Sequence, residues 1–145
     1  MTILRILTAP DDRLTQACAD VDFADPRTLE LGEDLLETMV FAAGRGLAAP
    51  QVGVCVRMFA MRLGDRLAVL CNPTIVRHGK DVVTDVEACL SLPGRRRRVP
   101  RYNIVEVDCY NISGIHQPPL KLRGIDARCA QHEIDHLSGK LITEY

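Results

Sequence analysis

The pentapeptide HEIDH at residues 132–136 constrains this chain more than any other feature of its sequence. On a helix, His132 and His136 lie one turn apart on the same face, and this geometry chelates a single metal ion. Glu133 follows the first histidine and can reach a water on that metal without being a ligand. A divalent metal lowers the pKa of such a water toward ~7, so Glu133 could transfer its proton. The alternative is an exposed helix that carries two histidines by chance.

A catalytic metal site of this kind needs a third protein ligand. Only nine residues follow His136, and the longer pattern HExxHxxGxxH is half met. Gly139 is in place, but Ile142 stands where the third histidine would be. Glu144 lies so near the end of the sequence that we do not expect it to fold back onto the metal. We therefore expect the third ligand to come from an earlier part of the chain.

The upstream candidates are a cysteine, His78, His116 or a carboxylate, and Cys89 is favoured among them. It follows a strand-like run and precedes Pro93-Gly94. A thiolate there would complete a Cys-His-His site with a fourth position left for water, which is the catalytic rather than the structural arrangement. The alternative is that Cys89 is a small buried apolar residue.

The segment GRGLAAPQVG at residues 44–53 is a second candidate for function. Its two glycines and small residues suit a backbone that a substrate approaches closely. The amide group of Gln51 could donate a hydrogen bond to a developing oxyanion. The alternative is a tight connection between a helix and a strand.

Composition excludes several classes of protein. The 145 residues carry a formal net charge of −1 and are 47% hydrophobic, which argues against a uniformly basic nucleic-acid binder and a disordered chain. No two cysteines form CxxC, and the first residues resemble no secretory signal. No stretch approaches the ~18 apolar residues of a membrane span. We expect one domain over residues 1–145, in a reduced, cytoplasmic protein with most cysteines buried. The cysteines are Cys18, Cys55, Cys71, Cys89, Cys109 and Cys129.

Hydrophobic periodicity predicts an α+β domain of antiparallel strands around a C-terminal helix, with one N-terminal helix. The first helix is expected over residues 26–43, ended by Gly44, and the second over residues 125–138, closed by Gly139. Residues 111–119 read as a loop because they contain glycine and two prolines. Strands are expected over residues 54–63, 66–70, 74–76, 82–86, 103–110 and 120–122.

Five arginines at positions 95–98 and 101 follow the candidate Cys89. Such a basic run could contact ribosomal RNA or an acidic partner. A solvated loop is the commoner outcome, and it is the one we expect here.

Three stretches in this order, GRGLAAPQ, EACLS and QHEIDHL, resemble the three motifs of the peptide deformylase family. The resemblance implies a metal-dependent hydrolase that removes the formyl group from the N-terminal methionine of new polypeptides and releases formate. It implies that Cys89, His132 and His136 bind the metal, usually ferrous iron, with zinc, nickel or cobalt as substitutes. Glu133 would be the general acid and base.

The same resemblance implies that Gln51 and the backbone N–H of Leu90 stabilise the oxyanion. Gly46 would contact a substrate that lies extended beside a strand. Arg96 occupies a position where family members often have an arginine near the exit of the substrate. The implied partners are formyl-methionyl nascent peptides and the ribosome, with no membrane and no specific nucleic acid.

Three residues depart from the usual family pattern. Ala88 replaces a glycine of the second motif, Arg45 replaces an apolar residue between the first glycines, and Arg128 stands at a helix position that is often apolar. The two arginines could narrow the methionine pocket, charge it, or extend to solvent. Two alternatives to an ordinary deformylase therefore stay open: an amidohydrolase with a changed substrate, and a non-catalytic module that binds RNA or an acidic protein.

Overall fold

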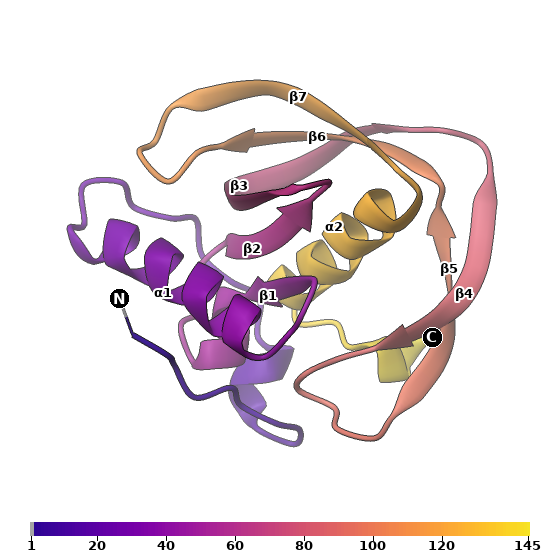
Figure 1. The fold of residues 1–145 in the computed structure, drawn as a ribbon, viewed down its shortest axis with the longest axis horizontal. Coiled ribbons are helices and arrows are strands. Elements are labelled where there is room, and N and C mark those ends of the chain that lie inside the picture. The colour runs from indigo at the N-terminus through magenta and orange to yellow at the C-terminus, as the bar shows by residue number, and fades with distance from the viewer. Residues whose placement is uncertain (1) are drawn as a thin grey trace.

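The computed structural model describes residues 2–145 as two helices, a five-stranded antiparallel sheet and a separate two-stranded hairpin (Figure 1). This confirms the expected α+β class. The five-stranded sheet has the order β1-β2-β3-β6-β7, and β4 pairs only with β5. The elements are α1 (Arg27–Phe41), β1 (Gly46–Ala48), β2 (Met58–Leu63), β3 (Arg66–His78), β4 (Val82–Ala88), β5 (Arg96–Tyr102), β6 (Ile104–Tyr110), β7 (His116–Arg123) and α2 (Gly124–Leu137), with 3-10 turns at Asp12–Thr15, Ala49–Val52 and Ile142–Glu144.

Helix α1 lies where its periodicity predicted it. The Asp25 carboxylate accepts a hydrogen bond from the backbone N–H of Arg27 at 2.9 Å, which satisfies one of the free donors of the first turn. The helix ends at Phe41, and the chain reverses through Ala43, whose φ is +56°. The expected end at Gly44 was therefore wrong by a few residues, because a non-glycine residue adopts the left-handed conformation here.

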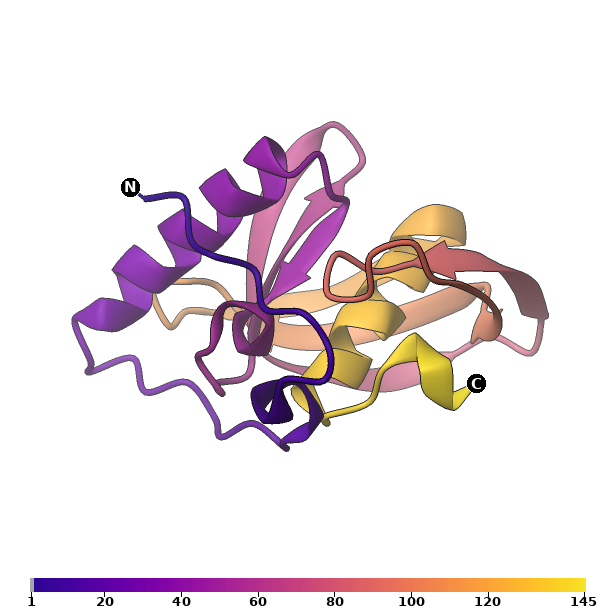
Figure 2. The same ribbon diagram turned by 90° about the horizontal axis from the view of Figure 1, so that it is seen from below.

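Strand β2 lies between the two helices, and its alternate residues face one helix or the other (Figure 2). Phe59 and Met61 belong to the cluster that contains Ala127 of α2. The neighbouring Met58 and Ala60 belong to the cluster that contains the α1 core residues. Successive side chains of a strand point to opposite faces, so a run that is buried throughout indicates a strand covered on both sides.

The sheet differs from expectation in four places. β2 begins at Met58, four residues later than expected. β3 is one 13-residue strand that joins two expected strands across an irregular register between Cys71 and Thr74. β7 begins at His116, inside the expected loop. Its prolines are tolerated because β7 is an edge strand of the sheet. The short strand β1 was not expected.

Arg95–Arg98 are exposed to solvent as expected, but the expected loop was wrong, because Arg96–Arg98 and Arg101 lie in strand β5. It pairs with β4 from Val82↔Tyr102 to Ala88↔Arg96. Residues on a strand alternate between faces, and Arg101 points inward with 5% of its surface exposed. The β4–β5 hairpin runs along the side of α2 away from β1 (Figure 1).

The N-terminal segment packs against the last residues of the chain (Figure 2). The backbone N–H of Cys18 donates to the carbonyl of Leu137 at 2.9 Å, at the end of α2. A third hydrophobic cluster joins the N-terminal segment, the hairpin and the C-terminal 3-10 turn, and comprises Leu7, Leu14, Leu92, Val99, Leu141 and Ile142. All six cysteines are free, and Cys71, Cys109 and Cys129 are buried. Over residues 2–145, no helix is both long enough and apolar enough to span a membrane.

Candidate active site

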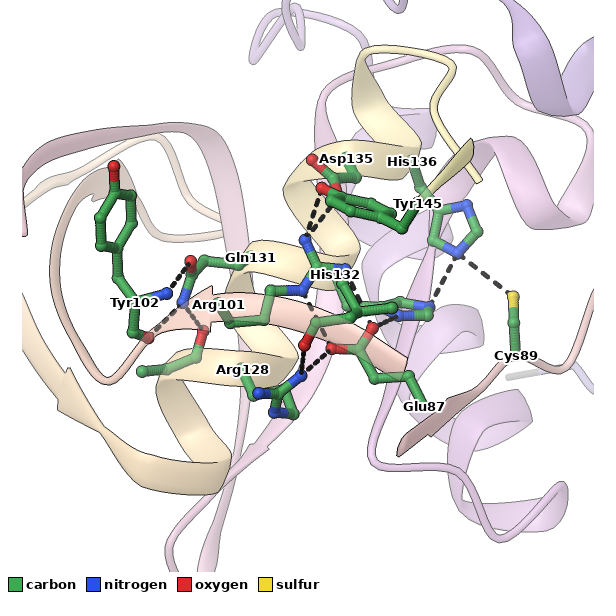
Figure 3. A network of polar contacts seen from close by, with 12 residues as sticks. Glu87, Cys89, Arg101, Tyr102, Arg128, Gln131, His132, Asp135, His136 and Tyr145 are labelled. Carbon is green, nitrogen blue, oxygen red and sulfur yellow. Dashed lines mark hydrogen bonds and ion pairs between the residues drawn. The ribbon is translucent and has the colours of Figure 1, made fainter. Parts of the chain in front are cut away.

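Cys89, His132 and His136 come together from two elements that are far apart in the sequence (Figure 3). Cys89 directly follows β4, and the two histidines lie one turn apart on α2. Nε2 of His136 lies 3.2 Å from Nε2 of His132 and 3.4 Å from Sγ of Cys89. All three candidate ligand atoms lie within 4.8 Å of one another. The structure therefore brings together the three residues expected to hold a metal.

These separations fit a shared metal ion. Two nitrogens and one sulfur at ordinary bond lengths from a tetrahedral ion lie about 3.3 Å (N to N) and about 3.6 Å (N to S) apart. The observed 3.2 Å and 3.4 Å are close to both values. A thiolate and two imidazoles suit iron, zinc, cobalt or nickel.

Glu87 fixes the orientation of His132. Nδ1–H of His132 donates to Oε1 of Glu87 at 2.8 Å, which turns Nε2 toward the cluster, 3.2 Å from Nε2 of His136. Burial alone would raise the pKa of Glu87, but hydrogen bonds from Arg101 and His132 outweigh it and hold the pKa at about 2. Glu87 is therefore a carboxylate at neutral pH and remains an acceptor.

Burial and charged neighbours shift the pKa values of the two histidines in opposite directions. Burial lowers the pKa of His132, but hydrogen bonds to Cys89 and Glu87 and the charge of Glu133 raise it to about 10. Burial and the neighbouring His132 keep the pKa of His136 well below its usual value, so His136 is a neutral imidazole. A metal ion would have to displace this proton from His132 before it could bind there.

Glu133 lies against the backbone of β1. Its side chain is almost fully buried, and this burial raises its pKa to about 7. A Cβ atom added to Gly46 would lie 2.5 Å from Oε1 of Glu133, so only glycine leaves room there. A carboxyl group with a pKa near neutrality suits a general acid and base.

Gln51 is held with its amide group toward Cys89. Its Oε1 accepts a hydrogen bond from the backbone N–H of Ala48 at 2.9 Å. Its Nε2 donates to Oγ of Ser91 at 3.1 Å and lies 3.7 Å from Sγ of Cys89. The amide nitrogen of Gln51 therefore lies between Ser91 and the candidate ligand Cys89, and Leu90 lines the same pocket.

A cavity of about 370 Å³ opens beside the cluster, between β1 and β4. Val86, Leu90, Ile125 and Cys129 give it an apolar wall. The full lining is Gly44, Arg45, Gly46, Gln51, Val86, Glu87, Ala88, Cys89, Leu90, Ile125, Arg128, Cys129, His132 and Glu133. Such an apolar pocket next to a few polar groups is typical of a small-ligand site.

The three arginines that the sequence suggested as substrate contacts lie in different places relative to the pocket. Arg45 lies at the pocket and forms an ion pair with Asp126 at 3.2 Å, with its side chain 44% exposed. Arg128 is also at the pocket, but its guanidinium is bound to other residues and is largely buried. Arg96 pairs with Ala88 across the hairpin and is not among the residues that line the pocket.

The other candidate third ligands are engaged away from the cluster. His78 stacks on Tyr102, with ring centres 3.7 Å apart. His116 lies 2.7 Å from the carboxylate of Asp108. The Glu144 carboxylate accepts a hydrogen bond from the backbone N–H of Leu141.

The sequence reasoning missed the residues that support the cluster. Glu87 is the first residue of the stretch EACLS, but no function was predicted for it. Arg101 was treated as part of a basic surface, whereas its Nε and Nη2 donate to the two oxygens of Glu87 at 2.9 Å each. Arg101 was not distinguished from the neighbouring arginines. Its place on the inward face of a strand would have indicated that it is buried.

Comparison with known proteins gives a consistent result. Residues 3–145 match the polypeptide deformylase family. A peptide deformylase of Clostridium botulinum is 40% identical over 145 residues, which cover 99% of this chain and 97% of that protein. The crystal structure of a peptide deformylase from Ehrlichia chaffeensis in complex with actinonin has a TM-score of 0.95 at 35% identity, over 100% of this chain and 89% of that one. A Met-Ala-Ser-bound peptide deformylase from Acinetobacter baumannii has a TM-score of 0.91 at 28% identity, over 99% and 98% of the two chains.

Proposed function

The chain belongs to the polypeptide deformylase family, a family of metal-dependent hydrolases that remove the N-formyl group from nascent polypeptides, and we propose that Cys89, His132 and His136 are its metal ligands. Glu133 is the general acid and base of the reaction. The observation that carries this proposal is the convergence of the three ligand atoms within 4.8 Å, with the buried carboxyl group of Glu133 on the same helix.

The metal supplies Lewis-acid chemistry, since it polarises a carbonyl oxygen and lowers the pKa of water. Glu133 accepts the proton of the water that attacks the formyl carbon. The amide hydrogens of Gln51 and the backbone N–H of Leu90 donate to the oxygen that becomes negative. Glu133 then gives its proton to the leaving amine nitrogen, the C–N bond breaks, and formate departs.

The substrate peptide lies between β1 and β4, each of which pairs with another strand on one side only. An extended peptide there can form hydrogen bonds with the free edges of these strands. Because Gly46 has no side chain, the backbone of the peptide can approach Glu133. The first side chain of the peptide enters the apolar part of the cavity, against Val86 and Ile125.

A methionine side chain suits this cavity better than a charged one. The charge of Arg128 is neutralised within the protein by Glu87, and that of Arg45 is paired with Asp126. Neither guanidinium is therefore a free cation inside the pocket. This arrangement supports the ordinary deformylase substrate, formyl-methionyl peptide, over a changed acidic one.

Ferrous iron is our choice for the native metal, with zinc, nickel and cobalt as substitutes that the same ligands accept. Formylated nascent chains are found where translation occurs. We therefore place the enzyme in the cytoplasm, acting on chains that emerge from the ribosome.

A substrate panel tests this function. The iron-loaded protein is assayed anaerobically for formate release from formyl-Met-Ala-Ser, formyl-Glu-Ala-Ser and formyl-Lys-Ala-Ser. We expect the methionyl peptide to be the best substrate by at least about tenfold in kcat/KM, because only its side chain enters an apolar pocket without losing hydration of a charge. A preference for the glutamyl peptide would contradict the proposal and indicate that an arginine faces the substrate.

A further inference from the structure

The β4–β5 hairpin forms one wall of the cavity without sharing a backbone ladder with the main sheet. The structure instead places polar side chains of α2 against it. Gln131 binds both the N–H and the carbonyl of Tyr102, at the far end of β5. His132 binds Glu87, next to the metal cluster. Besides the hydrophobic contacts of Leu92 and Val99, the position of the cavity wall therefore depends on polar side-chain contacts with α2.

Arg128 makes three of these contacts (Figure 3 draws the one to Glu87). Its Nη1 donates to Oε2 of Glu87 at 2.6 Å and to the carbonyl of Val99 at 2.8 Å. Its Nη2 donates to the carbonyl of Val83 at 2.6 Å. One guanidinium thus binds β4 at two points and β5 at a third. Its side chain is only 15% exposed, so water replaces these contacts poorly.

Glu87 does not depend on Arg128 alone. Arg101 donates to both of its carboxylate oxygens at 2.9 Å. His132 keeps its own hydrogen bond to Oε1, the oxygen that Arg128 does not contact. Loss of Arg128 would therefore leave the orientation of the metal ligand in place, whereas the carbonyls of Val83 and Val99 would lose a charged donor.

We propose that Arg128 is a positioning residue that clamps the β4–β5 hairpin to α2 and so fixes the width of the peptide-binding cleft. It acts on substrate affinity rather than on the chemical step. The part that concerns the substrate rests on the proposed deformylase function. The clamp itself does not, because it follows from the three hydrogen bonds.

The test compares the metal-loaded wild type with Arg128→Met, Arg128→Lys and Arg97→Met. Methionine keeps an unbranched apolar stem and removes all donors. Lysine restores a charged donor but not the planar fork that reaches three acceptors. Arg97 lies on the same hairpin, is exposed, and donates only to the neighbouring carbonyl of Arg96, so Arg97→Met is the matched control.

The first readout is amide hydrogen exchange in β4, which needs no substrate. We expect exchange at residues 82–88 to rise about tenfold or more in Arg128→Met, because lost charge-assisted hydrogen bonds of this kind correspond to about that factor in an opening equilibrium. Arg128→Lys should fall between the wild type and Arg128→Met, and Arg97→Met should match the wild type. Unchanged exchange in Arg128→Met would overturn the clamp. If Arg128→Met does not fold, the comparison of Arg128→Lys with the wild type decides the same point.

The second readout is the division of the effect between KM and kcat for formyl-Met-Ala-Ser. We expect Arg128→Met to raise KM about tenfold and to leave kcat and the affinity for Co²⁺ within about threefold. A fall in kcat or in Co²⁺ affinity at unchanged KM would overturn the proposal and assign Arg128 to the support of His132. If the wild type released no formate from this peptide, the proposed function would fail, and the exchange experiment would still decide the clamp.

Discussion

Gly46 and Glu133 are in direct contact, because a Cβ atom on Gly46 would lie 2.5 Å from Oε1 of Glu133. Glu133, the proposed general base, therefore lies against the backbone of strand β1, along which we place the substrate. Both the proton-transfer group and the substrate contact depend on the absence of one side chain. Through this pair, the first motif (GRGLAAPQ) packs directly against the third (QHEIDHL).

Gly46→Ala should lower kcat by about 100-fold, since a displacement of a catalytic group by about 1 Å has an effect of that size. None of the atoms nearest to a Cβ on Gly46 belongs to Cys89, His132 or His136, so metal content should stay at one ion per chain. Formate release and metal analysis check this. Gly79→Ala is the control, because a Cβ there comes no closer than 3.4 Å to its neighbours. A Gly46→Ala enzyme with wild-type kcat would show that Glu133 tolerates displacement.

Glu87→Gln should weaken metal binding by roughly 10- to 100-fold, because replacing the group that orients a metal-binding histidine typically lowers metal affinity by that factor. It should also lower the free energy of unfolding by about 3 kcal/mol, since Arg101 and Arg128 would lose the buried carboxylate that they share and only Arg101 would keep a charged partner, Asp135. Titration with Co²⁺ and urea denaturation measure the two effects.

Glu106→Gln is the matched control for this change. Its ion pair with Arg77 is long, at 3.8 Å, and Arg77 is 81% exposed, so we expect less than about 1 kcal/mol. Equal losses in the two variants would contradict the central position that we give to Glu87.

Gly139→Ala should destabilise the fold much more than Gly64→Ala. Both glycines have positive φ, at +75° and +58°, so both substitutions carry a backbone strain of about 1 kcal/mol. Only at Gly139 would the new Cβ also meet backbone, at 2.6 Å from Thr15. Thermal unfolding of the two variants measures the difference, and similar losses would argue against close packing of the N-terminal segment on the end of α2.

The helix that carries the two histidines and the order of the motifs could be predicted from the sequence, because local periodicity and ligand spacing are visible in a short window. His132 and His136 were identified in this way as proposed metal ligands, and the structure brings them together with Cys89. The clustering of Cys89 with two histidines that lie more than forty residues later depends on tertiary packing. The ordered resemblance of three motifs, rather than periodicity, supplied that information.

The hairpin was harder to predict. Arg96–Tyr102 contains four arginines and a proline, and such a segment has no apolar alternation to indicate a strand. Its stability comes from cross-strand pairing with β4 and from the buried contacts of Arg101, which no local pattern displays. Arg128 lines the pocket as expected, but no local pattern showed that its guanidinium binds the hairpin.

Cys71 should resist alkylation in the folded protein. Burial raises the pKa of its thiol to about 12, so at pH 8 only roughly one molecule in 10⁴ carries the thiolate, the reactive form. Treatment with iodoacetamide followed by peptide mass spectrometry measures labelling. The protein in denaturant serves as the fully reactive control, and native labelling of Cys71 at that rate would contradict its burial.

The most direct test of the account is formate release from formyl-Met-Ala-Ser by the wild type and by Glu133→Ala, each prepared anaerobically with one iron per chain. The account predicts rapid release by the wild type and a loss of at least about 1,000-fold in kcat in the variant at equal metal content, because proton transfer at both ends of the reaction passes through Glu133. A Glu133→Ala protein that keeps wild-type kcat would contradict the mechanism.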